Sequence, residues 1–507
     1  MNSIMAIAPL AVFMTAALGV SVYARRRVRT QGADSFVSEY FIGGRSMGAF
    51  VLAMTTIATY GSVSSFVGGP GKAWDVGWGW VYMAAVQVTS LFMLYGIMGK
   101  KMALVSRRVN AVTVIDVIRA RYGSEPLAWI SAIVIVVFFG TTMIAQFVGG
   151  ARLFAAVTGY SYVAGLALFG AIVVLFTTIG GFRGVAITDA LCGVAMLVGI
   201  AVLAGGLLWA GGGWDGLMAT IEANHPHMME PLAGGKMPVG LYFTQWLIVG
   251  VFTFCLPQSV VRTLGFKDAR SLRRALVLGT VIIGAMMIGC TALGTMSAGV
   301  LTEGIDAYGG SIDNIIPQAI VQTLPPWLAG VAIVGPLAAS VSTISSLLIA
   351  ASSAIVRDLW MHARQRSGAP ASERSARMFS QLATLVVGAV VFVLAITPPD
   401  VIWKINMFAF GGLETAFCWV LVAGLFWKRA SAGGALLSMV GGVTAYCATM
   451  AAGISVAGLH QITIGLSVAL VLMIAGSALL PGKYRGHLPV FFGIPETAAG
   501  DASVQKG

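Results

Sequence analysis

The chain has 507 residues, of which 58% are hydrophobic and 10% charged, with a net charge of +12 and a mean hydropathy of +0.88. These values exclude a soluble globular enzyme, because soluble chains carry more charge and less apolar sequence. The apolar runs are continuous over the roughly 20 residues that a helix needs to cross a bilayer, which also excludes the alternating pattern of a transmembrane barrel. We therefore predict an all-α membrane protein.

Hydropathy predicts about thirteen transmembrane helices. Their approximate centres, in chain order, are Val12, Ala58, Ala85, Val136, Ile172, Ala201, Val249, Ile283, Ala338, Val387, Val420, Val443 and Ala469. The cluster Arg25, Arg26 and Arg27 follows the first apolar run, whereas in a secretory signal the positive residues come first. We therefore expect the first helix to be retained.

The second predicted helix is interrupted. Residues 55–71 read TTIATYGSVSSFVGGPG, in which hydroxyl residues and glycine fill nearly every position from Thr59 to Ser65. Inside a bilayer an unpaired backbone carbonyl costs several kcal/mol, so a break is tolerated only where protein or water covers it. Close packing of small residues is the alternative reading. Because transporters use broken helices with free carbonyls to hold a cation near the midplane, we predict an ion and substrate site here.

The ninth predicted helix supplies a second polar wall. It carries five hydroxyl residues within seven positions, which are Ser340, Ser342, Thr343, Ser345 and Ser346. A single serine or threonine in a membrane helix usually bonds to its own turn, which is the alternative for each of them. Sodium prefers oxygen ligands, and hydroxyls with carbonyls supply these without burying a carboxylate. We predict that this wall faces the interrupted helix.

The positive charges predict the orientation. If every second connection faces the cytoplasm, 27 of the 31 lysines and arginines lie on that side, and only Lys72, Arg152, Lys236 and Lys404 lie opposite. We expect a bacterial inner (plasma) membrane protein with its N-terminus outside and its C-terminus in the cytoplasm. This explains the net charge without nucleic acid. The five cysteines and five histidines show no disulfide framework and no convincing metal-ligand spacing, and no nucleophile–base–acid set indicates an enzyme.

Six stretches identify a family. The chain resembles the sodium/solute symporter family along nearly all of its length, and most closely its sodium/pantothenate branch, in EYFIGGRSMGAFVLAMTTIATYGSVSSFVGGPG, AQFVGGARL, GGFRGVAITD, LPQSVVR, STISSLLIAASSAIVRDLW and INMFAFGGLETAFCWVLVAGLFWKRASAGGAL. The resemblance implies an inverted five-plus-five repeat of the leucine-transporter type, with one extra N-terminal and two extra C-terminal helices. The implied divisions are an N-terminal helix and basic loop (1–45), the first repeat (46–211), an external connection (212–240), the second repeat (241–427), two C-terminal helices (428–481) and a cytoplasmic tail (482–507).

The resemblance also implies a sodium site. By position, its ligands are the carbonyls of Ala58, Gly61 and Ala339 and the hydroxyls of Ser342 and Thr343. Asp189 corresponds to an acidic residue on the sodium exit path, although an aspartate in the first turn of a helix can instead compensate the helix dipole. Family members often carry glutamine where this chain has Cys192, which leaves any polar contact there in question.

The implied substrate cavity has four walls. Its candidates are Thr59, Tyr60, Ser62 and Ser65 on the first, Gln146 on the second, Thr244, Gln245 and Gln258 on the third, and Glu414 and Thr415 on the fourth. Pantothenate has a carboxylate, two hydroxyls and an amide, which suit such a pocket, although polar residues also hold helices together. We expect sodium-coupled uptake of a small carboxylate, most simply pantothenate, by alternating access.

Two alternatives to this function stay open. The first is the same transporter with another monocarboxylate or an amino acid such as proline, and the second is a channel or a sensor on this fold. The expected partners are sodium, the substrate and the lipid bilayer, with no nucleic acid and no obligate protein partner.

Overall fold

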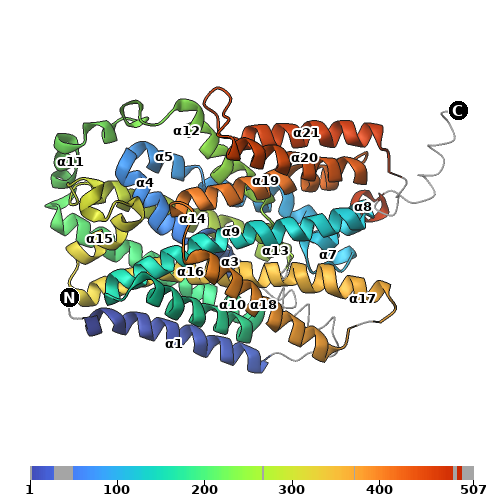
Figure 1. Ribbon diagram of the computed structural model, residues 1–507, viewed down its shortest axis with the longest axis horizontal. Coiled ribbons are helices and arrows are strands. Elements are labelled where there is room, and N and C mark those ends of the chain that lie inside the picture. The colour runs from blue at the N-terminus through green and yellow to red at the C-terminus, as the bar shows by residue number, and fades with distance from the viewer. Residues whose placement is uncertain (1–2, 28–48, 265–267, 370, 483–487, 494–507) are drawn as a thin grey trace.

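The computed structural model describes residues 3–27, 49–264, 268–369, 371–482 and 488–493, and every regular element within these ranges is a helix (Figure 1). The predicted all-α class is therefore confirmed. A helix pairs its backbone groups within one segment, which is what a chain in hydrocarbon requires. The basic connection that contains Arg29 and Arg45, the beginning of the first predicted repeat and the end of the tail lie outside the described residues.

The first half of the chain forms several long helices and one interrupted helix, in which a break separates α3 from η2 and α4. In order these are α1 (Ser3–Arg27), α3 (Ala49–Tyr60), η2 (Ser64–Gly68), α4 (Gly69–Val76), α5 (Trp78–Ala85), α6 (Val88–Leu91), η3 (Phe92–Gly99), α7 (Lys100–Arg108), α8 (Val114–Tyr122), α9 (Glu125–Thr158), α10 (Tyr162–Ala210) and α11 (Gly213–Asn224). The helix α10 contains two predicted spans, joined at Gly181, whose φ is 55°. Glycine adopts this left-handed conformation without the steric penalty of a Cβ atom.

The second half has the same character. Its elements are short turns at Pro226–Met229 and Ala233–Gly235, then α12 (Val239–Trp246), η6 (Leu247–Val251), η7 (Phe252–Cys255), α13 (Pro257–Arg262), α14 (Ala269–Ser297), η8 (Ile305–Tyr308), η9 (Ile312–Asn314), α15 (Ile315–Thr323), α16 (Pro326–Ser353), η10 (Ala354–Met361), α17 (His362–Arg366), α18 (Glu373–Ala395), α19 (Ile402–Phe426), α20 (Ala432–Ala451), α21 (Ile462–Leu479) and η11 (Leu488–Phe492). The short π-helical elements η6 and η10 continue α12 and α16. The residues at these two junctions, Trp246 and Ser353, keep right-handed helical backbone angles.

Ten helical segments among the described residues are long and apolar enough to cross a membrane. They contain ten of the thirteen predicted centres. The other three centres, Val12, Ala58 and Val249, lie in α1, in the interrupted α3 and in the shorter apolar stretch Val239–Cys255. The many-helix membrane fold is thus confirmed, while the count of thirteen stays a prediction.

The helix α16 lies at the centre of the molecule. It packs against α1, α9, α10 and α18, and its most apolar window is entirely buried. The approach to α10 is close, because a Cβ atom added at Gly199 would lie 2.8 Å from the Ala332 carbonyl oxygen. Small residues permit such contacts between membrane helices. The serine-rich face of α16 therefore contacts protein instead of lipid.

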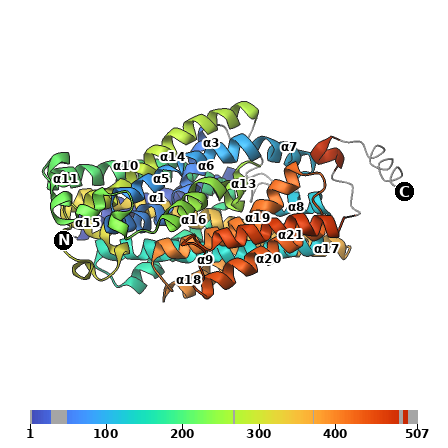
Figure 2. The ribbon, with the colours of Figure 1, turned by 90° about the horizontal axis from the view of Figure 1, so that it is seen from above.

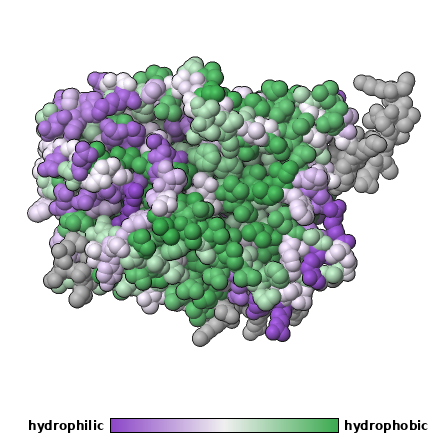
Figure 3. Space-filling view, viewed as in Figure 1, coloured by the Kyte–Doolittle hydropathy of each residue, from purple (hydrophilic) through white to green (hydrophobic). Residues whose placement is uncertain are grey.

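The helices run between two polar ends. Figures 1 and 2 place α11 and α15 at one end and α8 and α17 at the other, which we call the α11 end and the α8 end. Hydrophobic residues cover the middle of the face in Figure 3, and hydrophilic residues gather at the left, over α11 and α15, and at the lower right. This distribution is what a bundle that crosses a bilayer presents.

Candidate functional site

The predicted interruption is present. After α3, Gly61 and Ser62 are not helical, and the chain then continues into η2. An added Cβ atom at Gly61 would lie 2.6 Å from Met286 Cε, so a larger residue would displace that side chain. The amide of Val63 donates to Gln146 Oε1 at 2.8 Å. A side chain from α9 thus satisfies a backbone group that the interruption takes out of the helical pattern.

The five residues predicted to hold sodium meet at one point between α3 and α16. Ser342 Oγ donates to the Ala58 carbonyl at 2.7 Å and lies 3.0 Å from the Ala339 carbonyl. Thr343 Oγ1 lies 3.3 Å from the Gly61 carbonyl and 2.9 Å from the Ala339 carbonyl. Three carbonyl and two hydroxyl oxygens therefore share a buried junction.

This arrangement suits a small cation. Each hydroxyl has a single proton and two acceptor lone pairs, so the hydroxyl can rotate its proton away and turn a lone pair toward an ion. Both hydroxyls also contact their own helix at Ala339, which is the back-bonding that the sequence left open as an alternative. The additional contacts to Ala58 and Gly61 join two helices, which back-bonding alone does not explain.

Asp189 lies beside this junction, toward the α8 end. Its Oδ2 accepts a hydrogen bond from Thr55 Oγ1 at 2.6 Å and lies 3.5 Å from Arg262 Nη2. The same guanidinium donates to Ser346 Oγ at 2.5 Å. Thr55 precedes the first sodium candidate on α3 by one turn, and Ser346 follows the last on α16 by one turn. Cys192, where the resemblance leads one to expect an amide, is fully buried.

An inner cavity of about 50 Å³ opens next to the interruption. Three predicted substrate residues, Tyr60, Ser62 and Ser65, line it. Tyr60 also donates its hydroxyl proton to the Val249 carbonyl, which ties this wall to η6. The side chain of Thr59, a fourth candidate, lies outside the described part of the structure. The remaining candidates do not line this cavity.

Four polar residues that the sequence analysis did not select also line the inner cavity. They are Ser64, Gln87, Thr291 and Asn406, and they accompany the rings of Trp80 and Trp403. Asn406 is 2% exposed, and its Oδ1 has no hydrogen-bond partner among the described residues. An amide within an apolar helix is the signal that could have identified Gln87 and Asn406, since such residues mark functional sites in membrane proteins.

Two predicted substrate residues have clear structural contacts. The side-chain oxygen of Gln146 accepts a hydrogen bond from the Val63 amide, and the backbone carbonyl of Gln146 accepts one from Ser340 Oγ at 2.7 Å. The Thr244 hydroxyl donates a hydrogen bond to the Gly240 carbonyl at 2.8 Å and accepts one from the His460 amide at 3.0 Å. Both residues join segments of the chain, as polar residues in membrane helices often do.

The four other candidates lie in three different places. Gln245 lines a larger cavity toward the α11 end, and Gln258 lines a small one beside Arg262. Glu414 and Thr415 are fully buried, and their side-chain oxygens have no hydrogen-bond partners within the described ranges. The two residues of the fourth predicted wall are therefore buried polar groups that do not line the inner cavity.

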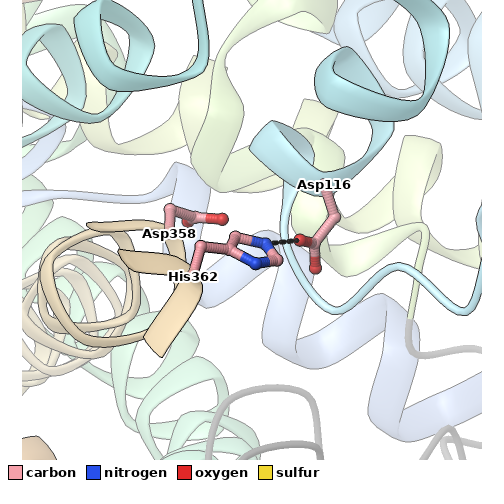
Figure 4. A group of neighbouring side chains, drawn as sticks. All are labelled: Asp116, Asp358 and His362. Carbon is pink, nitrogen blue, oxygen red and sulfur yellow. Dashed lines mark hydrogen bonds and ion pairs between the residues drawn. The ribbon is translucent and has the colours of Figure 1, made fainter. Parts of the chain in front are cut away.

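Two carboxylates and a histidine meet at the α8 end, as Figure 4 shows. One ligand-type atom from each of Asp116, Asp358 and His362 lies within 4.8 Å of the others. Arginines share the carboxylates, since Arg119 lies 3.6 Å from Asp116 and 3.9 Å from Asp358, and Arg357 lies 3.8 Å from Asp116. These cations make the cluster an ion-pair network. Sequence spacing could not reveal it, because Asp116 and His362 are 246 residues apart.

This network anchors α8. Thr113 and Asp116 form a capping box at its first turn, and Thr113 Oγ1 donates to Asp358 Oδ1 at 2.8 Å. Burial opposes ionisation of Asp116, yet the hydrogen bond with His362 and the charge of Arg357 hold the pKa of that carboxyl below its ordinary value. The ionised aspartate thus fastens α8 to the end of η10.

A second ion pair lies at the opposite end. Asp313 Oδ2 is 2.9 Å from Arg152 Nη1 on α9 and accepts the Ile402 amide at 3.1 Å, at the beginning of α19. Burial raises the pKa of this carboxyl, and Arg152 partly offsets the effect. Asp313 therefore holds α9 and α19 together at the α11 end.

Comparison with known proteins agrees with this geometry. A profile of the sodium:solute symporter family matches residues 40–442. The sodium/pantothenate symporter of Haemophilus influenzae is 38% identical over 474 residues, which cover 93% of this chain and 96% of that protein. An osmoregulated proline transporter of Bacillus subtilis is 26% identical over 505 residues, which cover 97% and 98% of the two chains. The chain belongs to the sodium:solute symporter family, and hence to a family of transporters and not of enzymes.

A solved structure extends the likeness to the fold. The structure of a Na⁺-coupled sialic acid symporter in a substrate-bound outward-open state matches with a TM-score of 0.80 at 20% identity. The match covers 95% of this chain and 99% of that one. The expected transporter fold is therefore confirmed over nearly the whole molecule.

Proposed function

We propose that the protein is a sodium/pantothenate symporter, which couples the inward movement of sodium to the uptake of pantothenate by alternating access. The observation that carries this proposal is the meeting of five oxygen-bearing residues between α3 and α16, at the point where α3 is interrupted. Membership of a sodium-coupled family supplies the ion, and the chemistry of the cavity walls supplies the kind of substrate.

The geometry supports a direct coupling between ion and substrate. The proposed sodium ligands Ala58 and Gly61 alternate along the chain with Tyr60, Ser62 and Ser65, which line the inner cavity. An ion that fixes the carbonyls of this segment therefore also fixes the cavity wall. Binding of either ligand then favours binding of the other, because a coupling free energy between two sites is reciprocal.

Asp189 gives the ion a route away from the junction. We place it on the sodium path because its carboxylate lies one helical turn beyond the ligands, toward the α8 end. Arg262 contacts both Asp189 and Ser346, so a sodium ion that passes here must compete with the guanidinium for the oxygen atoms of these two residues. Because of this competition the ion is bound weakly at this point and can leave.

The choice of pantothenate depends on similarity and on the inner cavity. Identity is 38% to a pantothenate symporter and 26% to a proline transporter, each over nearly the full length. The cavity offers two amides and several hydroxyls, from residues that include Gln87, Asn406, Thr291 and Ser65. These groups can donate to the carboxylate and accept from the hydroxyls of pantothenate.

We also propose that the α8 end is cytoplasmic. Several of the described arginines lie there, among them Arg108, Arg119 and Arg121, which bind carbonyls or carboxylates of neighbouring segments. Arg152 and Lys236 contact residues of the α11 end instead. A reporter fused after Arg366 should be cytoplasmic, and one placed in the 215–236 connection should be external; the reverse pattern would refute this orientation.

Uptake in proteoliposomes tests the function. Labelled pantothenate should accumulate when sodium is high outside, and accumulation should disappear when sodium is equal on both sides. Unlabelled pantothenate should compete with it, whereas proline, glucose and acetate should not. Strong competition by proline would assign the protein to the amino acid branch of the family instead.

A further inference from the structure

A second, larger cavity lies toward the α11 end. Its volume is about 600 Å³, against about 50 Å³ for the inner cavity. It lies where α12 and α19 begin and α20 ends, and residues of α9 complete its wall. Pockets for small organic ligands have volumes of roughly 300 to 1,000 Å³. We call it the outer cavity; in the proposed orientation it lies on the external side.

Two side chains separate the outer cavity from the inner one. Trp403 and Met407, one turn apart on α19, line both cavities. The ring of Trp403 packs edge-on against Trp80, with a centroid distance of 5.8 Å. Its backbone also presses on η2, since a Cβ atom added at Gly68 would lie 3.0 Å from the Trp403 amide nitrogen. The partition is thus attached to the interrupted segment.

The outer cavity combines apolar walls with a few polar groups. Gln245 is 1% exposed and lines the cavity, and its Oε1 has no hydrogen-bond partner among the residues that the structure describes. A buried amide oxygen without a partner is unfavourable unless a ligand or water satisfies it. Lys404 and Asp400 add one charge of each sign to the lining, and Phe408 and Met450 add apolar surface.

The charged and titratable groups of the outer cavity are compatible with an anionic ligand. Lys404 is 54% exposed and lies 3.3 Å from Asp400, so the pair is solvated and a ligand carboxylate can compete for it. Burial lowers the pKa of His460 to about 4, so this lining residue is neutral near pH 7. A ligand with a carboxylate at one end and an amide in its body fits this set of groups.

We propose that the outer cavity is a second binding site for the transported substrate, a small monocarboxylate with an amide, which occupies it before passing Trp403 and Met407. This inference rests on the proposed function. It adds to that function a site in which the substrate waits, with the amide facing Gln245 and the carboxylate near Lys404.

The test measures the accessibility of one cysteine. Gln461, at the edge of the outer cavity, is replaced by cysteine in a protein that carries Cys447→Ala; the other four cysteines are buried. A membrane-impermeant, charged thiol reagent then modifies the new cysteine with and without pantothenate. The inner cavity is blocked by Ser65→Phe, or by Thr291→Phe should the first variant not fold.

Pantothenate should slow the modification of Gln461→Cys even when the inner cavity is blocked. At about twice the dissociation constant, mass action gives ~3-fold slower modification. Adding Gln245→Leu to the blocked protein should raise the pantothenate concentration required by roughly 5-fold, the effect of one lost hydrogen bond. Thr302→Cys, in an exposed loop at the same end, should react at the same rate with and without pantothenate.

Two outcomes would overturn the inference. Protection that disappears in both blocked proteins, while the unblocked protein is protected and transports, would make the outer cavity a passage without a site. Absence of both uptake and protection in the unblocked protein would overturn the proposed function and the outer site together. Uptake measurements on the same preparations separate these two results.

Discussion

The proposed sodium junction and the proposed substrate walls differ in how they are built. At the junction, five residues from two helices meet within hydrogen-bond distances, and every one of them was expected there. The nine substrate candidates whose side chains the structure describes are divided among the inner cavity, the outer cavity, a small cavity beside Arg262 and other buried positions. An ion imposes short distances on its ligands, whereas a larger substrate can be held by groups spread along a path.

The comparison teaches that the two regions constrain their residues differently. The junction depends on backbone carbonyls, whose positions follow from the interruption of α3 and from Gly61. The cavity depends on side chains, which other residues of the same type can replace. Substitutions at the junction should therefore have larger and more specific effects than substitutions in the walls.

The largest effect is expected at the interruption itself. Gly61→Leu places a side chain where Met286 Cε already lies, 2.6 Å from the added Cβ position. Uptake should fall by about 100-fold, the loss associated with a displacement of roughly 1 Å in a binding site. The amount of protein in the membrane should not change, because leucine favours both helix and lipid.

Gly140→Leu is the matched control for this variant. Gly140 lies in the membrane-spanning part of α9, and apart from the backbone of its own helix no atom lies within 4 Å of an added Cβ. Its uptake should stay within about 2-fold of wild type, as expected where a substitution meets open space. Normal uptake by Gly61→Leu would show that the segment is ordinary packing and would remove the contrast between the two regions.

Removal of a hydroxyl at the junction should come next. Ser342→Ala and Thr343→Ala each lose one oxygen from a buried site, which corresponds to about 1 to 3 kcal/mol, or roughly 5- to 150-fold in sodium affinity. Saturating sodium should partly restore substrate affinity in Thr343→Ala. Substrate binding measured against sodium concentration provides the test.

The control here is Thr177→Ala. Thr177 is fully buried and bonds to the Val173 carbonyl of its own turn at 2.7 Å, which is the back-bonding alternative in isolation. Its sodium curve should coincide with that of the wild type. If the Ser342 and Thr343 variants coincide with it as well, these hydroxyls are not ligands.

A smaller effect is expected in the substrate wall. Asn406→Ala removes one amide from the inner cavity and should raise the apparent KM for pantothenate by roughly 3- to 10-fold, with little change in sodium affinity. Thr323→Val, whose buried hydroxyl bonds to the Ala319 carbonyl of its own turn and lines neither cavity, should leave KM within about 2-fold. Equal changes in both variants would contradict the assignment of the inner cavity.

The smallest effect concerns stability and pH. The folded-state pKa of Asp116 lies below its unfolded value, so the ionised group stabilises the fold at neutral pH, and this contribution is lost as the pH falls below about 4. Asp116→Asn should therefore lower the melting temperature of the purified protein by a few degrees near pH 7. The difference from wild type should shrink in acid. A difference that does not change with pH would argue against an ionic role.

Sequence predicted the parts of this molecule that depend on local pattern. Continuous apolar runs located ten spans, and the density of hydroxyls and glycine located the interruption and its partner face on α16. The resemblance then paired the two, which residue patterns alone do not do. The meeting of these carbonyls with the hydroxyls of α16 could be predicted because a backbone position does not depend on the direction of a side chain.

The rest depends on contacts between distant segments. Asn406 and Gln87 reach the inner cavity only because α19 and the region around α5 lie beside η2. Thr244 and Gln146 were chosen as polar residues within predicted helices. Their contacts with His460 and Val63 depend on how distant segments pack, which the sequence pattern does not reveal. The network at Asp116 joins residues 246 positions apart.

The complete burial of the most apolar window around α16 has a consequence for biosynthesis. Each span must enter the bilayer on its own hydropathy as it leaves the ribosome, before later helices such as α18 are available to cover it. The most apolar window around α16 has a mean hydropathy of 1.8, against 2.3 for α9 and α14. Packing would accept still more serine in this window, because protein covers all of it. The insertion machinery would not accept more serine, because each hydroxyl lowers the hydropathy on which insertion depends. The minimum hydropathy for insertion therefore limits how many hydroxyls the helix can bring to an ion.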